Sequence, residues 1–112
     1  MPDQPTAAQQ MIGDVAPKLV QLTDDVLFGD VWARPELAPR DRSLVTVAAL
    51  VTNGSTEQLS AHLRIARGNG LTETELVEAI VHLALDAGWP RAMSAIAVAK
   101  KVFTEDAERD GP

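Results

Sequence analysis

Hydrophobic residues recur every three or four positions over most of the chain, and this spacing predicts amphipathic helices. Between Ala7 and Phe28 the spacing is marked by Met11, Val15, Leu19, Leu22, Val26 and Leu27. Pro17 falls inside this stretch, where it suits the first turn of a new helix after a break. We therefore predict helical structure over 7–28, interrupted near Pro17 and followed by a connection that begins at Gly29.

Start and stop signals predict two further helices in the middle of the chain. The stretch SLVTVAALVTN begins close after Asp41 and is apolar nearly all round, so we expect a central helix that ends at Asn53-Gly54. Its Val and Thr content would also suit a strand, but its length and its helical neighbours favour a helix. Ser55 is a natural N-cap for the next helix, which would run to about Arg67.

The last third of the chain predicts two more helices. Thr72 and Glu75 have the spacing of a capping box, which would open a helix that runs to about Asp86. Pro90 is well placed to begin the last helix, which would run through Phe103. Because no stretch sustains an alternation of period two, the expected fold class is all-α. We predict a single-domain bundle of five or six helices over 7–107, a flexible arm over 1–6 and a flexible tail over 108–112.

Composition narrows the classes of function. The 112 residues suit one domain, and the low aromatic content of 4% leaves Ala, Val and Leu to form the core. The absence of cysteine excludes disulfides, thiolate metal sites and thiol catalysis. The net charge of −6 argues against nucleic acid and anionic membranes as partners. The first ten residues lack the features of a signal peptide, and no apolar stretch would span a bilayer, so we expect a cytoplasmic protein.

His62 is the first candidate for chemistry. Ser55, Gln58 and His62 follow one another at steps of three and four, and would form a polar stripe along one side of their helix. Histidine titrates near neutral pH, so His62 could act as a general acid or base. The alternative is a helix-edge histidine that makes only a local hydrogen bond, and the residues alone favour this alternative.

His82 is the second candidate. Glu78, His82 and Asp86 lie at steps of four, so a carboxylate could flank the imidazole on either side and favour its protonated form. An exposed charged stripe explains the same pattern equally well. The two histidines would lie on different helices without HxxxH or HExxH spacing, so we expect neither a metal nor a cofactor.

Two arginines and a tryptophan complete the candidates. Arg40 and Arg42 precede the most apolar helix, where either could clamp a carboxylate. A surface ion pair with Asp41 or Glu36 is the alternative, and the sequence alone favours it. Trp89 lies in the break between the last two helices; we expect it in the core, with a pocket wall as the alternative.

Three stretches resemble the carboxymuconolactone decarboxylase family, which belongs to the alkyl hydroperoxidase D-like superfamily. They are RSLVTVAAL at 42–50, HLRIARGNGLTETEL at 62–76 and HLALDAGWPRAMSA at 82–95, within a resemblance that spans roughly 34–103. It implies an all-helical protomer that assembles into a homotrimer or homohexamer, with its site in a cleft between helices. The small residues of SAIAVAKKVF suit either a seam between subunits or ordinary packing inside one chain.

The resemblance also separates two kinds of member. Peroxidase-like members carry a glutamate, a CxxC pair and a histidine four residues after the second cysteine. The histidine position is His62 here, whereas Ser55 and Gln58 occupy the cysteine positions. Ser43 occupies the glutamate position. A thiol relay is therefore excluded, and the resemblance is to the decarboxylase-like members, whose reaction needs no cofactor.

Decarboxylase-like members remove CO2 from a carboxylated unsaturated lactone, and the electrons left behind delocalise into the conjugated carbonyl. The resemblance implies His62 as the acid/base group and Arg42 as the carboxylate anchor. It implies His82 as a second polar group and Trp89 as a pocket wall. The remaining candidates for substrate binding are Ser43, Ser55, Gln58 and Asp86.

One departure concerns the substrate. Relatives often have an aromatic pair where this chain has Leu85-Asp86, and an aspartate that faced the pocket would repel an anionic substrate. The leading hypothesis is a cofactor-free decarboxylase of a small carboxylated lactone or a related unsaturated keto acid. An isomerase or cyclase on the same scaffold, and a non-catalytic small-molecule-binding or assembly protein, are the alternatives.

Overall fold

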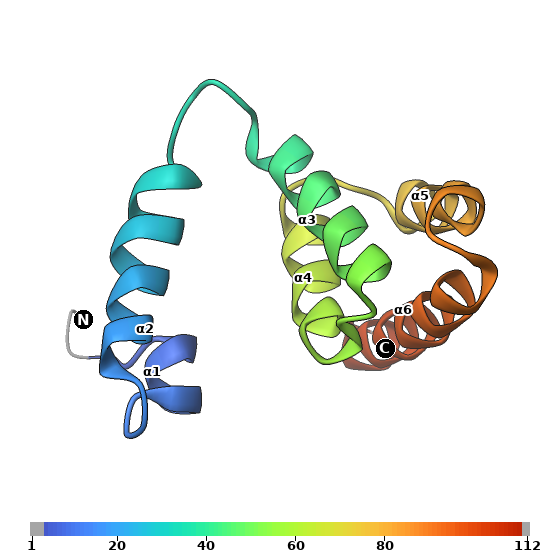
Figure 1. The fold of residues 1–112 in the computed structure, drawn as a ribbon. Helices are drawn as coiled ribbons and strands as arrows, with labels where there is room; N and C mark the ends of the chain where they lie inside the picture. The colour runs from blue at the N-terminus through green and yellow to red at the C-terminus, as the bar shows by residue number, and fades with distance from the viewer. Residues whose placement is uncertain (1–3, 111–112) are drawn as a thin grey trace. The chain divides into compact units, whose positions relative to one another are not determined.

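The computed structural model describes residues 4–110 (Figure 1). All regular elements within this range are helices, which confirms the predicted fold class. The chain divides into two compact units, Met1–Leu37 and Ala38–Pro112, and each is described by itself. None of the helices in the described range is long and apolar enough to cross a membrane. Of the predicted arm over 1–6 and the predicted tail over 108–112, residues 1–3 and 111–112 lie outside the described range.

The described part of the first unit, residues 4–37, contains three short helices. They are α1 (Ala7–Ile12), α2 (Pro17–Gln21) and the π-helix η1 (Leu22–Val31). Thr6 caps α1 in a capping box: its hydroxyl accepts from the Gln9 N–H at 3.1 Å, and its own N–H donates to the Gln9 side chain at 2.8 Å. Pro17 opens α2, which confirms the break predicted there.

The prediction that helical structure ends at Phe28 is wrong. Helix η1 continues through Gly29 to Val31, and the Trp32 N–H donates to the Leu27 carbonyl at 2.8 Å. A Cβ on Gly29 would lie 2.8 Å from the Asp24 carbonyl oxygen, so glycine fits inside this wider turn instead of ending the helix. Only Val20 is buried among the described residues of the unit, and the apolar face predicted from the spacing is exposed.

In the second unit, residues 38–110 form four longer helices around one core. They are α3 (Pro39–Asn53), α4 (Thr56–Gly68), α5 (Glu73–Asp86) and α6 (Trp89–Asp110). The buried side chains are small or aliphatic: Val47, Val51, Leu59, Leu63, Ala66, Leu71, Leu76, Ile80, Leu83, Ala92, Ala95, Ala99 and Val102. Ala95, Ala99 and Val102 come from SAIAVAKKVF, so this side of α6 packs inside the chain.

The predicted signals at the ends of these helices are present. Gly54 ends α3 with φ +72°, and the Arg91 guanidinium lies where a Cβ on Gly54 would stand. Ser55 occupies the N-cap position of α4, but its side chain makes no capping hydrogen bond. Thr72 and Glu75 form the predicted capping box of α5, with bonds of 3.0 and 2.9 Å.

The prediction that the last helix ends at Phe103 is wrong, since α6 continues to Asp110. Ion pairs between its last turns and α4 stabilise the longer helix. Asp106 lies one turn beyond Phe103, and its side chain is only 15% exposed. It lies 3.3 Å from Arg64 Nε, 3.6 Å from Arg67 Nη1 and 3.5 Å from Arg109 Nη2. The polar sequence after Phe103 therefore continues the helix through Asp110.

We expect Asp106→Asn to lower the free energy of unfolding by about 2 kcal/mol, between the values for exposed and buried ion pairs. The substitution keeps the side-chain volume but removes the charge that faces three arginines. Glu105→Gln is the matched control, because Glu105 is more exposed and, among residues 4–110, forms one ion pair, with Arg64 at 2.7 Å. Urea unfolding of both variants measures the difference, and equal losses would contradict the central role of Asp106.

Candidate active site

His62 lies on α4, beside a row of buried residues that faces the core. Leu59, Leu63 and Ala66 form that row, and His62 is half-buried at its edge. Seven residues later, Asn69 Nδ2 donates to Ser43 Oγ of α3 at 3.0 Å. Because seven residues make two helical turns, His62 lies on the side of α4 that contacts α3, about 10 Å along the axis from Asn69.

The His62 imidazole has an unused hydrogen-bonding atom. Its Nδ1 is buried and has no partner among residues 4–110. Burial lowers the pKa of His62 below its usual value of 6.5, because desolvation disfavours the charged ring. The ring is therefore mostly neutral at pH 7. A buried polar atom without a partner is rare in a folded protein, and it marks His62 as a group that could bind a ligand.

Ser43 is buried next to the helix contact and not in an open pocket. Its hydroxyl accepts the bond from Asn69, a residue that the sequence did not single out. Ser43 and Asn69 are far apart in the sequence, so only the packing of α3 against α4 shows that Asn69 is the partner of Ser43. A role for Ser43 in substrate binding stays a prediction.

The two arginines before the central helix differ in their surroundings. Arg40 forms ion pairs with Asp41 and with Glu75 of α5, so the predicted alternative of a surface ion pair is confirmed for Arg40. Arg42 is half-buried in the first turn of α3, one residue before Ser43. Its position on the helix that contacts α4 keeps it a candidate anchor for a carboxylate.

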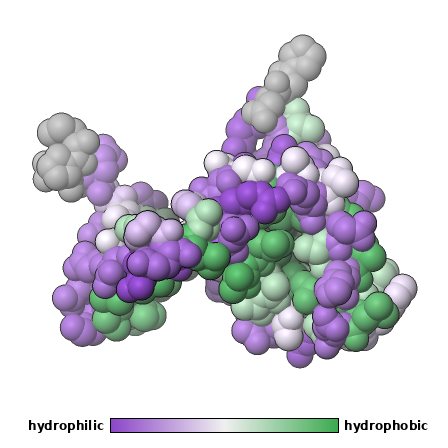
Figure 2. All heavy atoms as spheres, turned by 90° about the horizontal axis from the view of Figure 1, so that it is seen from above, coloured by the Kyte–Doolittle hydropathy of each residue, from purple (hydrophilic) through white to green (hydrophobic). Residues whose placement is uncertain are grey.

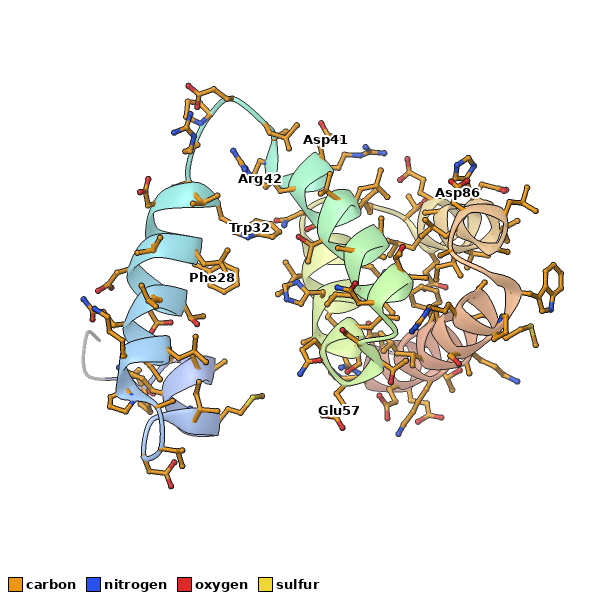
Figure 3. The ribbon with its side chains drawn as sticks, in the orientation of Figure 1. Phe28, Trp32, Asp41, Arg42, Glu57 and Asp86 are labelled. Carbon is orange, nitrogen blue, oxygen red and sulfur yellow. The ribbon has the colours of Figure 1, made fainter. Side chains whose placement is uncertain are left out.

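His82 and Asp86 form a separate exposed pair on α5. His82 Nε2 lies 3.2 Å from Asp86 Oδ2, and both side chains are mostly exposed. Figure 3 shows Arg42 at the start of α3 and Asp86 at the end of α5, on different sides of the second unit. The structure therefore does not bring the His82–Asp86 pair together with Arg42, and the exposed charged stripe is the arrangement observed.

Ser55 and Gln58 precede His62 along α4 in the predicted stripe. Ser55 is half-buried at the helix start and Gln58 is exposed. Their place beside His62 is compatible with substrate binding, which stays a prediction. Among residues 4–110, no three His, Cys, Asp or Glu side chains gather as a metal site would require.

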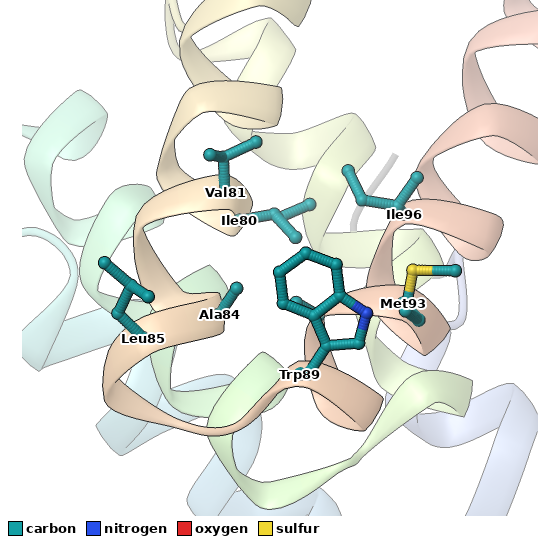
Figure 4. A pocket seen from close by; sticks show the side chains of 8 residues that line it. Ile80, Val81, Ala84, Leu85, Trp89, Met93 and Ile96 are labelled. Carbon is teal, nitrogen blue, oxygen red and sulfur yellow. The ribbon is translucent and has the colours of Figure 1, made fainter.

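Trp89 lies outside the core, so the expectation that it is buried is wrong. It is 67% exposed and lines a hollow of about 280 Å³ between α5 and α6 (Figure 4). Trp89 instead forms part of a pocket wall, which was the alternative prediction. Apolar side chains alone line this hollow, and His62 and Arg42 are not among them.

Comparison with known proteins adds independent information. The model of the carboxymuconolactone decarboxylase family matches residues 17–101, which includes part of the first unit. A protein of Acinetobacter baylyi named 4-carboxymuconolactone decarboxylase is 44% identical over 78 residues, which cover 70% of this chain and 58% of the relative. A protein of Metarhizium robertsii named nitrosuccinic acid decarboxylase is 34% identical over 85 residues, which cover 76% of this chain and 59% of the relative. The chain thus spans less than three-fifths of either relative's length.

Proposed function

Because the chain belongs to the carboxymuconolactone decarboxylase family, we propose that it is a cofactor-free decarboxylase of a small carboxylic acid. The single observation that carries this proposal is His62, whose half-buried ring keeps an unpartnered Nδ1 beside the contact between α3 and α4. The names of both relatives support the reaction type. The expected substrate is a carboxylated unsaturated lactone or a related acid.

The proposed reaction transfers one electron pair and one proton. The bond between the substrate carbon and its carboxylate breaks, and its electron pair moves into the conjugated carbonyl to give a dienolate. CO2 leaves, and the dienolate carbon takes a proton from His62 in the fraction of molecules whose ring is protonated. His62 then takes a proton back from solvent, so each turnover consumes one solvent proton. Fixed hydrogen-bond donors would stabilise the dienolate oxygen, because charge develops there as the bond breaks.

Arg42 is the proposed anchor for the substrate carboxylate. A guanidinium binds a carboxylate with two parallel hydrogen bonds, which would fix the orientation of the substrate. Arg42 lies in the first turn of α3, the helix that also provides Ser43. Ser55 and Gln58 would complete the polar side of the site from α4. We assign no catalytic role to His82, because its exposed ring contacts Asp86 at a different edge of the second unit.

The substrate class is open to chemical variation. A muconolactone can take up the released electrons in a conjugated carbonyl, and nitrosuccinic acid can do so in its nitro group. Both are acids with an electron-accepting group near the carboxylate that leaves. Asp86, which would repel an anionic substrate if it faced the pocket, is exposed and contacts His82. We therefore keep both acids as probes for this chain, together with a proposed homotrimer or homohexamer as its assembly.

The test follows CO2 release by the purified full chain from 4-carboxymuconolactone and, separately, from nitrosuccinic acid. We expect turnover of at least one acid, with one CO2 released for each molecule consumed. An isomerase or cyclase would consume the acid without releasing CO2, and a binding protein would shift the His62 NMR signals without turnover. Absence of CO2 release from both acids by the folded protein would reject the proposal for these substrates.

The pH dependence of kcat/KM distinguishes an acid from a base. Since kcat/KM reports ionisations of the free enzyme, and a proton donor must be protonated, we expect kcat/KM to fall as the pH rises past the pKa of His62. Burial lowers that pKa, so the midpoint should lie below 6.5. Rates measured from about pH 5 to 8, the range in which histidine changes charge, test this. A rise of kcat/KM with pH would instead make His62 a general base.

A further inference from the structure

Asn69 occupies a fixed position at the end of α4. It is the C-cap residue of the helix, and its backbone N–H donates to the carbonyls of Ile65 and Ala66 at 2.9 and 3.2 Å. The next residue, Gly70, has φ +106°, a conformation that residues with a Cβ rarely adopt. After this turn the Leu71 N–H donates back to the Ala66 carbonyl at 3.0 Å. The Asn69 side chain therefore leaves a backbone that is held on both sides.

Ser43, the partner of Asn69, is buried in the first half of α3. Its side chain is 1% exposed, and it is the one buried polar residue within the range 4–110. Its Oγ accepts a hydrogen bond from Asn69 Nδ2 at 3.0 Å. The bond lies beside an apolar contact, because the other buried side chains of α3 and α4 are aliphatic: Val47, Val51, Leu59, Leu63 and Ala66.

A hydrogen bond fixes the register of two helices more sharply than apolar packing does. Apolar contacts are non-directional, so packed helices can slide along each other by small amounts. A hydrogen bond from nitrogen to oxygen holds only between about 2.7 and 3.2 Å. A slide of α3 along α4 by one residue, about 1.5 Å, would therefore break the bond between Asn69 and Ser43.

We propose that Asn69 is a positioning residue that sets the place of Arg42 relative to His62. Arg42 is next to Ser43 in the chain, so the Cα atoms of these two residues lie about 3.8 Å apart. His62 precedes Asn69 by two turns of α4, about 10 Å along the axis. The bond thus joins the helix of the proposed anchor to the helix of the proposed proton donor. This inference rests on the proposed function, which assigns those two roles.

The expected consequence concerns proton transfer more than binding. Without the bond, Arg42 still presents a guanidinium to the substrate carboxylate. The substrate would then be held out of line with His62, and a misplacement of about 1 Å can lower a rate a hundredfold. We therefore expect a lower kcat, with KM close to that of the wild type, because binding of the ground state is kept.

The first experiment measures kcat and KM for CO2 release from 4-carboxymuconolactone or nitrosuccinic acid by the full chain. Asn69→Ala and Ser43→Ala should each lower kcat by about 10- to 100-fold, with unchanged helix content by circular dichroism. The double variant should lose no more than either single variant, because both substitutions remove the same bond. Asn69→Gln keeps an amide donor and should recover part of the loss.

Asn53→Ala is the matched control for Asn69→Ala. Asn53 also precedes a glycine at the end of a helix, α3, but its side chain is exposed. Its replacement should leave kcat unchanged. A wild-type kcat for Asn69→Ala would overturn the proposal. Losses that add up in the double variant would also overturn it, because the two residues would then act separately.

The second experiment needs no turnover, so it separates this inference from the decarboxylase proposal. NMR cross-relaxation between the His62 ring protons and the side chains of α3 reports the register of α3 against α4. We expect the same contacts in the wild type and in Asn53→Ala, and weaker or displaced contacts in Asn69→Ala. If the folded wild type releases no CO2, the decarboxylase proposal fails and these contacts alone decide the role of Asn69. Contacts that stay unchanged in Asn69→Ala would reject that role.

Discussion

Replacing His62 by alanine or by glutamine should reduce decarboxylation by about 100- to 10,000-fold, the usual contribution of a general acid. Glutamine keeps a hydrogen-bonding side chain but does not titrate near neutral pH, so it separates proton transfer from simple polarity. Neither change removes a hydrogen bond to Nδ1, because that atom has no partner among the described residues. We therefore expect both variants to fold, and Arg42, the proposed anchor, to remain in place for the substrate carboxylate.

The His82→Ala variant tests whether the loss of decarboxylation is specific to His62. His82 is the other candidate histidine, and its ring contacts the Asp86 carboxylate at the exposed surface of α5. We expect less than a tenfold change in kcat for His82→Ala, with CO2 release measured under the same conditions. A large loss for His82→Ala, with activity retained by His62→Gln, would move the proton donor to α5 and reject the proposed role of His62.

Leu63→Ala, one residue further along α4, should instead lower the free energy of unfolding by about 2 to 5 kcal/mol. Leu63 is fully buried in the core of the second unit, so its truncation removes packed methyl groups and leaves a cavity. The loss is large relative to the total stability of a small domain, which is about 5 to 15 kcal/mol. Urea or thermal unfolding, followed by circular dichroism, measures it.

Val45→Ala is the control for Leu63→Ala. Val45 also carries an aliphatic side chain on a helix of the second unit, but it is 62% exposed. Its truncation should change the free energy of unfolding by about 0.5 kcal/mol or less. Similar losses for Val45→Ala and Leu63→Ala would contradict the placement of the core. On the same helix, the His62 variants should therefore lose decarboxylation and keep their stability. Leu63→Ala should lose free energy of unfolding.

Apolar surface reaches solvent on both units, as Figure 2 shows. In the first unit this surface is the amphipathic face predicted from the spacing, since Val20 is the one described residue there that is buried. In the second unit it includes Val81 and Leu85 of α5 and Trp89 and Met93 of α6. Periodic spacing predicts which side of a helix is apolar, but not what covers that side.

Local signals in the sequence predicted the starts and stops of most helices correctly. Pro17, Gly54 and the capping box of Thr72 and Glu75 act through the backbone within a few residues, so neighbouring sequence is sufficient to locate them. Periodicity likewise predicted that His62 lies on one side of α4 with Ser55 and Gln58, next to the apolar row. Family membership, which the comparisons show, was also visible in the motifs of the sequence.

Interactions between distant residues decided the rest. Helix α6 extends past Phe103 because Asp106 meets Arg64 and Arg67, about 40 positions earlier on α4. Trp89 is exposed because its neighbours Ala92 and Ala95 fill the core side of α6. The partner of Ser43 is Asn69, from the end of another helix. These contacts depend on how helices pack, and spacing along one helix does not contain that information.

The sequence by itself therefore determined an all-helical fold, the helix boundaries that depend on short-range capping, and His62 as the leading candidate for proton transfer. Only the tertiary structure decided that His62 is half-buried with an unpartnered nitrogen, that His82 contacts Asp86 at the surface, and that an apolar hollow opens between α5 and α6. The physical reason is range: capping and periodicity act over one or two turns, whereas burial, desolvation and ion pairing depend on side chains brought together from separate helices.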